Sequence, residues 1–173
     1  MDTLPATTNL SLIKAEKWAP HPGAATHDRA DETARRYESC ANGGLSCCGG
    51  WQFVYGGVVP GHRYRVRWRA DRRDLAQPLD MLVGHVYWRQ VAPDCFVPGT
   101  ATIWDYVDAD DDEDRTEFSA ELVAPEGAAA VTVRCTLRWT ARGAVVWSEP
   151  EVEDLGVWVA RPPVRVAVAT GSE

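Results

Sequence analysis

The sequence of 173 residues lacks any apolar run that approaches the roughly 20 residues of a membrane-spanning helix. It also lacks an excess of basic residues, because 18 lysines and arginines stand against 25 aspartates and glutamates, which gives a net charge of −7. Sequence-independent binding to nucleic acid or to an anionic membrane requires the opposite balance. The opening stretch MDTLPATTNLSLIK does not have the charged-then-apolar order of a signal peptide. We therefore expect a soluble chain that binds neither nucleic acid nor membrane.

The motifs of common catalytic classes are missing too. The chain contains no G-x-S-x-G elbow, no H-E-x-x-H pair, no phosphate-binding loop and no dinucleotide fingerprint, and its four histidines are scattered. An enzyme reading requires paired carboxylates in a cleft, such as Asp105 with Glu117 or Glu121, and any acidic chain supplies such pairs by chance. The sequence therefore favours a non-catalytic protein.

Five cysteines are an odd number, and no two of them are spaced as C-x-x-C. They cannot all pair within one chain, and no common zinc motif is present. Two interpretations of the vicinal pair Cys47 and Cys48 stay open: a redox-active or metal-binding pair, or packing of small apolar side chains with one bridge from Cys40. Cys135 lies on the apolar side of an alternating segment, and we expect it in the core.

Alternation at every second position recurs along the chain, whereas helical periodicity does not. In residues 131–140, VTVRCTLRWT, apolar side chains alternate strictly with threonine and arginine. We predict strands at residues 9–18, 35–40, 51–59, 62–70, 80–90, 100–107, 116–124, 129–140 and 143–151. About nine short strands joined by turns rich in Pro, Gly and Asp predict an all-β fold, an antiparallel jelly-roll β-sandwich, because parallel strands need long crossovers.

The predicted sandwich domain covers residues 1–155. Within it, residues 27–38 leave two alternatives open, a short helix or none. Residues 156–173 contain a stiff Arg-Pro-Pro stretch followed by the apolar VRVAVATG. We interpret them as a linker and the first strand of a following domain, or as an extra edge strand of the same sandwich.

Two predicted strands carry arginine at alternate positions. Residues 62–70, HRYRVRWRA, have four such arginines, and residues 131–140 have Arg134 and Arg138. One interpretation is a solvated face on which the arginines pair with acids of neighbouring strands, worth little energy per pair. The other is a binding surface.

Eight tryptophans are many for this length, and alternation separates them into two groups. The first group is expected in the core and comprises Trp51, Trp68, Trp139 and Trp147. Trp104 and Tyr106 share a face with a threonine, and we expect them to be exposed as a platform for sugar rings, with a second buried aromatic layer as the alternative. His85 and Tyr87 share the polar face of their strand. Together with Arg134 and Arg138, they complete the predicted ligand-binding surface.

The order of these segments resembles that of the galactose-binding-like carbohydrate-binding modules. Residues 58–66 are similar to the turn-strand unit V-x-P-G-x-x-Y-x-V of that family, and residues 124–133, APEGAAAVTV, to its AP-x-GA-x-x-V-x-V hairpin. Residues 143–153 then stand where the family has its closing strand. The likeness spans most of the chain, and its motifs consist of turn and core residues.

The resemblance implies a non-catalytic carbohydrate-binding accessory module of a multidomain bacterial enzyme, with a carbohydrate ligand and an adjacent catalytic domain as partners. The VRVA stretch of the tail resembles the opening strand of carbon-nitrogen hydrolases, which suggests that type of catalytic domain. The alternative is a structural or protein-interaction sandwich that positions or oligomerises its neighbour.

The resemblance also implies a structural calcium ion. In the family an aspartate of the closing strand helps to hold the metal; here Glu149 and Glu151 stand in its place, and Glu16 stands where the first strand has its acid. Calcium accepts glutamate oxygens. A second calcium candidate is the acidic run at residues 108–114, which lacks the glycine of an EF-hand loop and is alternatively a solvated acidic loop.

Overall fold

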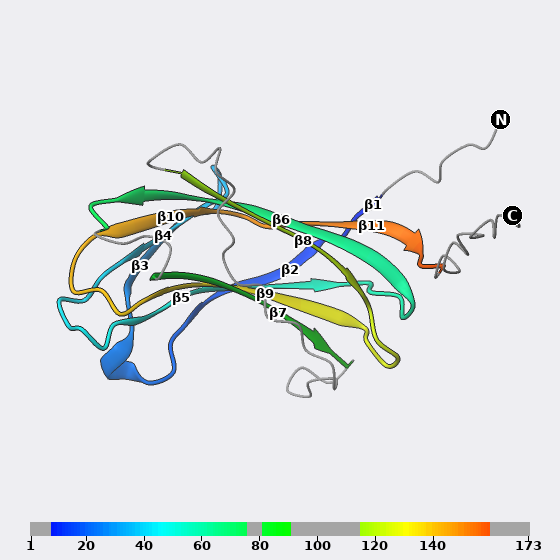
Figure 1. The fold of residues 1–173 in the computed structure, drawn as a ribbon, viewed down its shortest axis with the longest axis horizontal. Helices are drawn as coiled ribbons and strands as arrows, with labels where there is room; N and C mark the ends of the chain where they lie inside the picture. The colour runs from blue at the N-terminus through cyan, green and yellow to red at the C-terminus, as the bar shows by residue number, and fades with distance from the viewer. Residues whose placement is uncertain (1–7, 76–80, 91–114, 160–173) are drawn as a thin grey trace, which may run out of the picture.

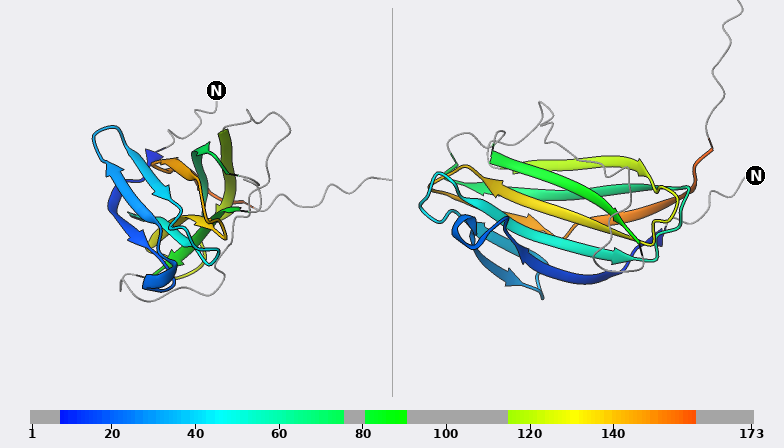
Figure 2. Two further views of the ribbon diagram at one scale, coloured as in Figure 1. Left: turned by 90° about the vertical axis from the view of Figure 1, so that its left-hand side faces the viewer. Right: turned by 90° about the horizontal axis from the view of Figure 1, so that it is seen from below.

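Two antiparallel sheets face each other and form a β-sandwich, as the sequence predicted (Figure 1). The computed structural model describes residues 8–75, 81–90 and 115–159. One sheet has four strands in the order β2-β5-β9-β7 (Figure 2, right). These strands are β2 Leu12–Trp18, β5 Cys48–Gly56, β9 Ala130–Arg138 and β7 Leu82–Arg89.

The second sheet has seven strands. Their order is β1-β11-β6-β10-β4-β3, and β8 pairs with the other edge of β6. The bounds are β1 Thr8–Asn9, β3 His27–Asp31, β4 Arg36–Cys40, β6 His62–Arg73, β8 Arg115–Val123, β10 Ala144–Ser148 and β11 Glu151–Val157. Strand β6 is long enough to pair with β11 along its first half and with β10 along its second.

The core lies between the two sheets and contains the apolar side of each alternating strand. Trp51, Phe53 and Tyr55 of β5 point inward beside Cys135 of β9, which is fully buried. Trp68 and Trp147 enter the core from the seven-stranded sheet. Alternation therefore predicted the inward face of these strands correctly.

Trp139 is the exception, and its assignment to the core was wrong. Strand β9 ends at Arg138, and Trp139 has a φ of 56°, in the left-handed region. This backbone geometry interrupts the alternation, so that the Trp139 side chain is 59% exposed. Its ring lies over the guanidinium of Arg138, with the carbon of that group 4.0 Å from the ring centroid.

The segment considered for a short helix forms a β-hairpin instead. Strands β3 and β4 pair in register from His27 with Cys40 to Asp31 with Arg36. The turn between them is held by the Asp31 carboxylate, which accepts a hydrogen bond from the backbone N–H of Ala34 at 3.0 Å. A side chain that bonds its own turn in this way competes with helix formation.

Other boundaries also differ from the prediction. Residues 9–18 belong to two strands, because β1 pairs with β11 in one sheet and β2 with β5 in the other. The described residues thus contain eleven strands, whereas about nine were predicted for the whole chain. Strand β11 extends to Val157, beyond the predicted domain limit at residue 155. The predicted strand at 100–107 and the tail from residue 160 lie outside the described residues.

The described cysteines carry free thiols. They are Cys40, Cys47, Cys48 and Cys135. Burial raises the pKa of Cys47 and of Cys48, which lowers the thiolate fraction that redox chemistry requires. The packing interpretation therefore fits this pair better. No helix among the described residues combines the length and apolar character needed to cross a bilayer.

The two faces of an alternating strand should differ sharply in their tolerance of charge. Cys135→Arg puts an unpaired charge into the core, and we expect it to abolish cooperative unfolding. Arg63→Ala removes one exposed ion pair with Glu121, and we expect it to cost at most about 1 kcal/mol. Urea denaturation followed by tryptophan fluorescence measures both. A folded Cys135→Arg protein would show that the inward face has been assigned wrongly.

Candidate functional site

The two arginine-bearing strands lie in different sheets and face opposite sides of the molecule. Strand β6 belongs to the seven-stranded sheet and β9 to the four-stranded sheet. In each case the arginines alternate with core residues, so they point away from the core. The two faces therefore have to be considered separately.

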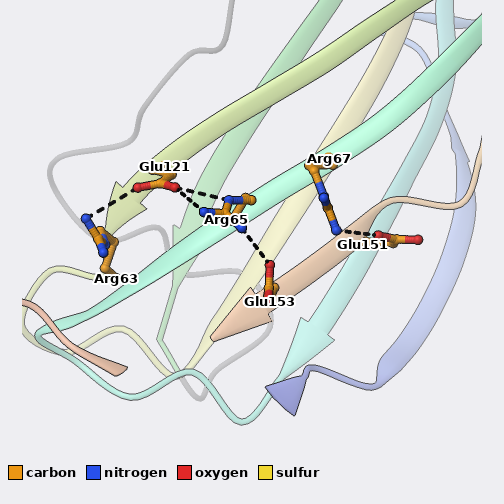
Figure 3. A network of polar contacts seen from close by, with 6 residues as sticks. All are labelled: Arg63, Arg65, Arg67, Glu121, Glu151 and Glu153. Carbon is orange, nitrogen blue, oxygen red and sulfur yellow. Dashed lines mark hydrogen bonds and ion pairs between the residues drawn. The ribbon is translucent and has the colours of Figure 1, made fainter. Parts of the chain in front are cut away.

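On the β6 face the arginines pair with acids of the strands on either side (Figure 3). The ion pairs are Arg63–Glu121 at 3.4 Å, Arg65–Glu121 at 2.7 Å, Arg65–Glu153 at 3.2 Å and Arg67–Glu151 at 3.1 Å. Solvent reaches these side chains, which screens each pair and leaves it little net energy. The interpretation as a solvated face with cross-strand pairs holds for this ladder.

Arg69 differs from its neighbours, because it has no ion pair among the described residues. Two hollows of about 290 Å³ and 270 Å³ lie beside it. The charged residues that line the larger hollow besides Arg69 are three glutamates and one arginine: Glu117, Glu149, Glu151 and Arg67. Three arginines and one acid line the smaller hollow, Arg35, Arg36, Arg69 and Asp71, and of these arginines Arg35 pairs with Glu149 and Arg36 with Asp71.

The outer face of the four-stranded sheet carries most of the predicted ligand-binding residues. Pairing of the strands places Glu16 opposite Gln52, Gln52 opposite Arg134, and Arg134 opposite His85. Since side chains at paired positions share a face, these four form one row across β2, β5, β9 and β7. Trp18 and Tyr87 lie in the rows on either side of it.

Arg134 is held at the centre of this row between two aromatic rings. Its guanidinium carbon lies 4.1 Å from the centroid of Trp18 and 4.8 Å from that of Tyr87. Its Nη1 donates to the Tyr87 hydroxyl at 3.4 Å and its Nη2 to Gln52 Oε1 at 3.2 Å. The ring of His85 stacks on Tyr87 at 5.7 Å. The cation is thus fixed in position by cation–π contacts and hydrogen bonds.

In the part of the chain that the structure describes, no carboxylate contacts Arg134 directly. The acid of the row is Glu16, whose Oε1 accepts a hydrogen bond from Gln52 Nε2 at 2.5 Å and which also pairs with Lys14. The Gln52 amide therefore stands between the guanidinium and the carboxylate. Burial lowers the pKa of Arg134. Burial, with the charges of Arg134 and Arg138, lowers the pKa of His85 to about 4, so His85 is neutral at pH 7.

Three buried polar atoms around Arg134 have no hydrogen-bond partner within the described part of the chain: its own Nε, Thr132 Oγ1 and Thr136 Oγ1. Thr132 and Thr136 precede and follow Arg134 by two residues on the same face, and they are 0% and 2% exposed. Such atoms also occur in the seven-stranded sheet, for example in Trp68 and Thr116. Buried polar groups are nearly always paired, so this cluster departs from the usual pattern.

The structure brings His85, Tyr87 and Arg134 together, as the prediction of one surface required. Arg138 shares their face, opposite Cys48, and lies over the exposed Trp139. Trp104 and Tyr106 lie outside the described residues.

Sequence reasoning missed two residues of the row and its flank, Trp18 and Gln52. The alternation of residues 51–55 places Gln52 on the outer face and could have identified it. Trp18 is the last residue of its strand, and only the pairing of β2 with β5 places it beside Arg134.

The acids predicted to hold calcium are not gathered in one place. Glu16 lies on the four-stranded sheet, whereas Glu149 bonds to Arg35 and Tyr37 and Glu151 pairs with Arg67 on the other sheet. No group of three His, Cys, Asp or Glu side chains in the described ranges is arranged to hold a metal ion. Glu16, Glu149 and Glu151 as placed do not fit a shared ion. Calcium stays an untested prediction, and the run at 108–114 lies outside the described residues.

Comparison with known proteins gives matches in structure only. No protein-family model and no curated protein matches the chain. A cyclase from Fischerella sp. TAU superposes with a TM-score of 0.52 at 8% identity, over 88% of this chain and 90% of the other. The enzymatically active domain of tailspike protein 4 of bacteriophage CBA120 gives 0.49 at 7% identity, over 82% of this chain and 18% of that one. A CBM4 carbohydrate-binding module gives 0.45 at 14%, over 81% and 86%. At 8% identity, the likeness to the cyclase shows the β-sandwich fold alone.

Because His85 is neutral in the folded chain, the free energy of unfolding should depend on pH. The pKa of His85 is about 4 in the folded chain and near 6.5 in the unfolded chain. Between these values the unfolded state binds a proton that the folded state does not, so stability present above pH 6.5 is lost as the pH falls. His85→Asn should lose less free energy of unfolding than the wild type between about pH 7 and about pH 4.5.

Urea titrations at several pH values measure this difference, and it isolates His85 from the carboxylates that titrate in the same range. The exposed His21, changed to Asn, controls for the loss of a histidine. Equal pH dependence of His85→Asn and the wild type would contradict the prediction.

Proposed function

We propose that this domain is a non-catalytic carbohydrate-binding module whose ligand lies on the outer face of the four-stranded sheet. One observation carries the proposal: Arg134 is in contact with the rings of Trp18 and Tyr87, beside buried polar atoms that have no partner among the described residues. Buried polar atoms without hydrogen bonds lower the stability of the folded state. The cluster becomes favourable when a polar ligand supplies the missing hydrogen bonds.

The chemistry of the face suits a sugar. Pyranose rings present C–H faces that pack on aromatic rings, and their hydroxyls both donate and accept hydrogen bonds. Trp18 and the exposed Trp139 provide aromatic surface, while Gln52, Arg134 and Glu16 provide an amide, a cation and an acid within one row. A binding site with a few well-placed polar groups among aromatic side chains is typical of small-ligand recognition.

The row is also organised before any ligand arrives. Arg134 has two ring contacts and two hydrogen bonds, and Gln52 is bonded on both sides. Fixing a long side chain costs entropy on binding, and here the fold has already met most of that cost. The resemblance to carbohydrate-binding modules supports the same function. It also supports an accessory role beside a catalytic domain, for which a carbon-nitrogen hydrolase stays the prediction.

Loss of the Trp18 ring should weaken glycan binding without unfolding the domain. Trp18 is half-buried at the end of an edge strand, so its removal leaves the core intact. We expect Trp18→Ala to reduce retention in affinity gels by about tenfold, which is ~1.4 kcal/mol. The matched control is Trp158→Ala, which removes an exposed tryptophan, 49% accessible, beyond β11 of the other sheet. Unchanged retention of Trp18→Ala would place the ligand elsewhere.

A second candidate function, a protein-interaction domain, is favoured by an apolar end of the sandwich. Trp158 bonds to Gly61 and Gly61 to Ala124, which brings the ends of β8 and β11 next to the turn before β6. Exposed apolar residues at this end are Val59, Val123, Val157, Trp158 and Val159. Exposed apolar side chains that gather in one place often mark a contact with another protein surface.

Light scattering after size-exclusion chromatography separates this second function from the first. If the apolar end joins two copies, the mass rises toward that of a dimer with concentration, and Trp158→Ser returns it to the monomer. A monomer at every concentration would remove self-association as a function of this end. Trp139→Ser, an exposed tryptophan on the other sheet, is the control and should leave the mass unchanged.

A further inference from the structure

We propose that the ligand of the four-stranded face carries a carboxylate, as in a glycan that contains uronic acid, and that this carboxylate pairs with Arg134. The inference rests on the proposed carbohydrate-binding function and names the class of sugar. Among the described residues, Arg134 has only neutral partners and no carboxylate.

Arg134 is a half-buried cation whose partners are all neutral. They are the Tyr87 hydroxyl, the Gln52 carbonyl and the faces of two aromatic rings. The acid of its row, Glu16, is occupied by Lys14 and by the Gln52 amide. On the opposite face, by contrast, Arg63, Arg65 and Arg67 each contact a carboxylate although water already solvates them (Figure 3). Arg134 is therefore a partly buried cation that no acid of the described residues contacts, and an unpaired charge becomes more costly as it is buried.

The hydrogen-bonding groups around Arg134 are short of acceptors. Arg134 Nε–H is buried and has no acceptor among the described residues, and the hydroxyls of Thr132 and Thr136 lie unpaired on the same strand and face. A guanidinium can only donate, whereas an ionised carboxylate can only accept and offers about four lone-pair sites. The threonine hydroxyls can donate or accept, so they suit a carboxylate and a sugar hydroxyl alike. The guanidinium N–H groups can only donate and carry the positive charge, and these are the groups that favour a carboxylate.

Arg134 also keeps terminal N–H groups that it could donate to a carboxylate. Its guanidinium carbon lies 4.1 Å from the centroid of Trp18 and 4.8 Å from that of Tyr87, and among the described residues each terminal nitrogen makes one hydrogen bond, so each has a second N–H. Planar guanidinium groups bind carboxylates edge to edge through two parallel hydrogen bonds, and such charge-assisted pairs are about twice as strong as neutral ones. The ring contacts and the two hydrogen bonds hold the guanidinium in place before a carboxylate arrives.

The test compares acidic polysaccharides with their own neutral forms. Affinity electrophoresis of the full chain in gels that contain polygalacturonate, alginate or hyaluronan is run beside gels with the same polymers after reduction of the carboxyl groups to alcohols. We expect at least one acidic polymer to retain the protein about tenfold more strongly than its reduced form. Added salt should weaken retention by the acidic polymer and leave the reduced one nearly unaffected.

Variants tie the preference to Arg134. Arg134→Gln should remove the difference between the acidic and the reduced polymer, and Arg134→Lys, which keeps the charge without the two-pronged geometry, should retain part of it. The matched control is Arg69→Gln, which removes one arginine without an ion pair from the opposite face and should leave the preference unchanged. Far-ultraviolet circular dichroism and the melting temperature establish that each variant is folded.

The outcomes separate the two proposals. Equal retention of the wild type by acidic and reduced polymers overturns the carboxylate and leaves carbohydrate binding standing. No retention by any acidic or neutral glycan overturns both. A preference for the acidic form that survives Arg134→Gln, or is lost in Arg69→Gln, overturns the role of Arg134. Should Arg134→Gln not fold, the comparison of polymers with the wild type and its salt dependence still decides whether the ligand is acidic.

Discussion

Aromatic contacts across the interior hold the two sheets together, and the placement of every outward side chain follows from them. Tyr37 of β4 packs against Trp51 and Phe53 of β5, at 5.0 and 4.7 Å between ring centroids, and Tyr64 of β6 meets Trp88 of β7 at 5.9 Å. Each contact joins one sheet to the other. Because side chains alternate along a strand, fixing these rings inward sends their sequence neighbours outward and leaves no freedom of register. Gln52 stands between Trp51 and Phe53, and its place on the outer row is a consequence of that packing.

The same constraint explains why two similar arginine patterns have different chemistry. Strands β6 and β9 both alternate arginine with core residues, but the strands beside them are different. Strand β6 lies between β8 and β11, whose outward positions carry glutamates, so Arg63, Arg65 and Arg67 have acids as partners. Strand β9 lies between β5 and β7, whose outward positions opposite Arg134 carry glutamine and histidine. The partners of an arginine are decided by which strands pair, and that pairing is a property of the topology.

This dependence sets the limit of what could be predicted from the sequence. Alternation alone predicted the sandwich, the inward residues of β5, β6 and β9, and a shared face for Arg134 and Arg138. It failed at Trp139, where the left-handed backbone ends the strand, and at the β3–β4 hairpin, where a turn bonded by Asp31 was considered for a helix. It could not bring Trp18 to Arg134, because these residues are 116 positions apart in the numbering and meet only through β5. The acids predicted to share a calcium ion were separated for the same reason.

On the outer face of the four-stranded sheet, several buried polar atoms without partners among the described residues lie close together around one cation. In the interior the Tyr55 hydroxyl bonds to the Pro150 carbonyl at 2.5 Å and the Trp147 indole to Ser39 at 3.2 Å, so these buried polar groups are satisfied. Around Arg134, a cation lacks an acid and three buried polar atoms lack partners within the described residues. Each such defect costs stability, and defects of this kind gather where a protein uses them. On the seven-stranded sheet Arg63, Arg65 and Arg67 each have an acid of a neighbouring strand as partner, and a partner from outside the chain would serve Arg134 in the same way.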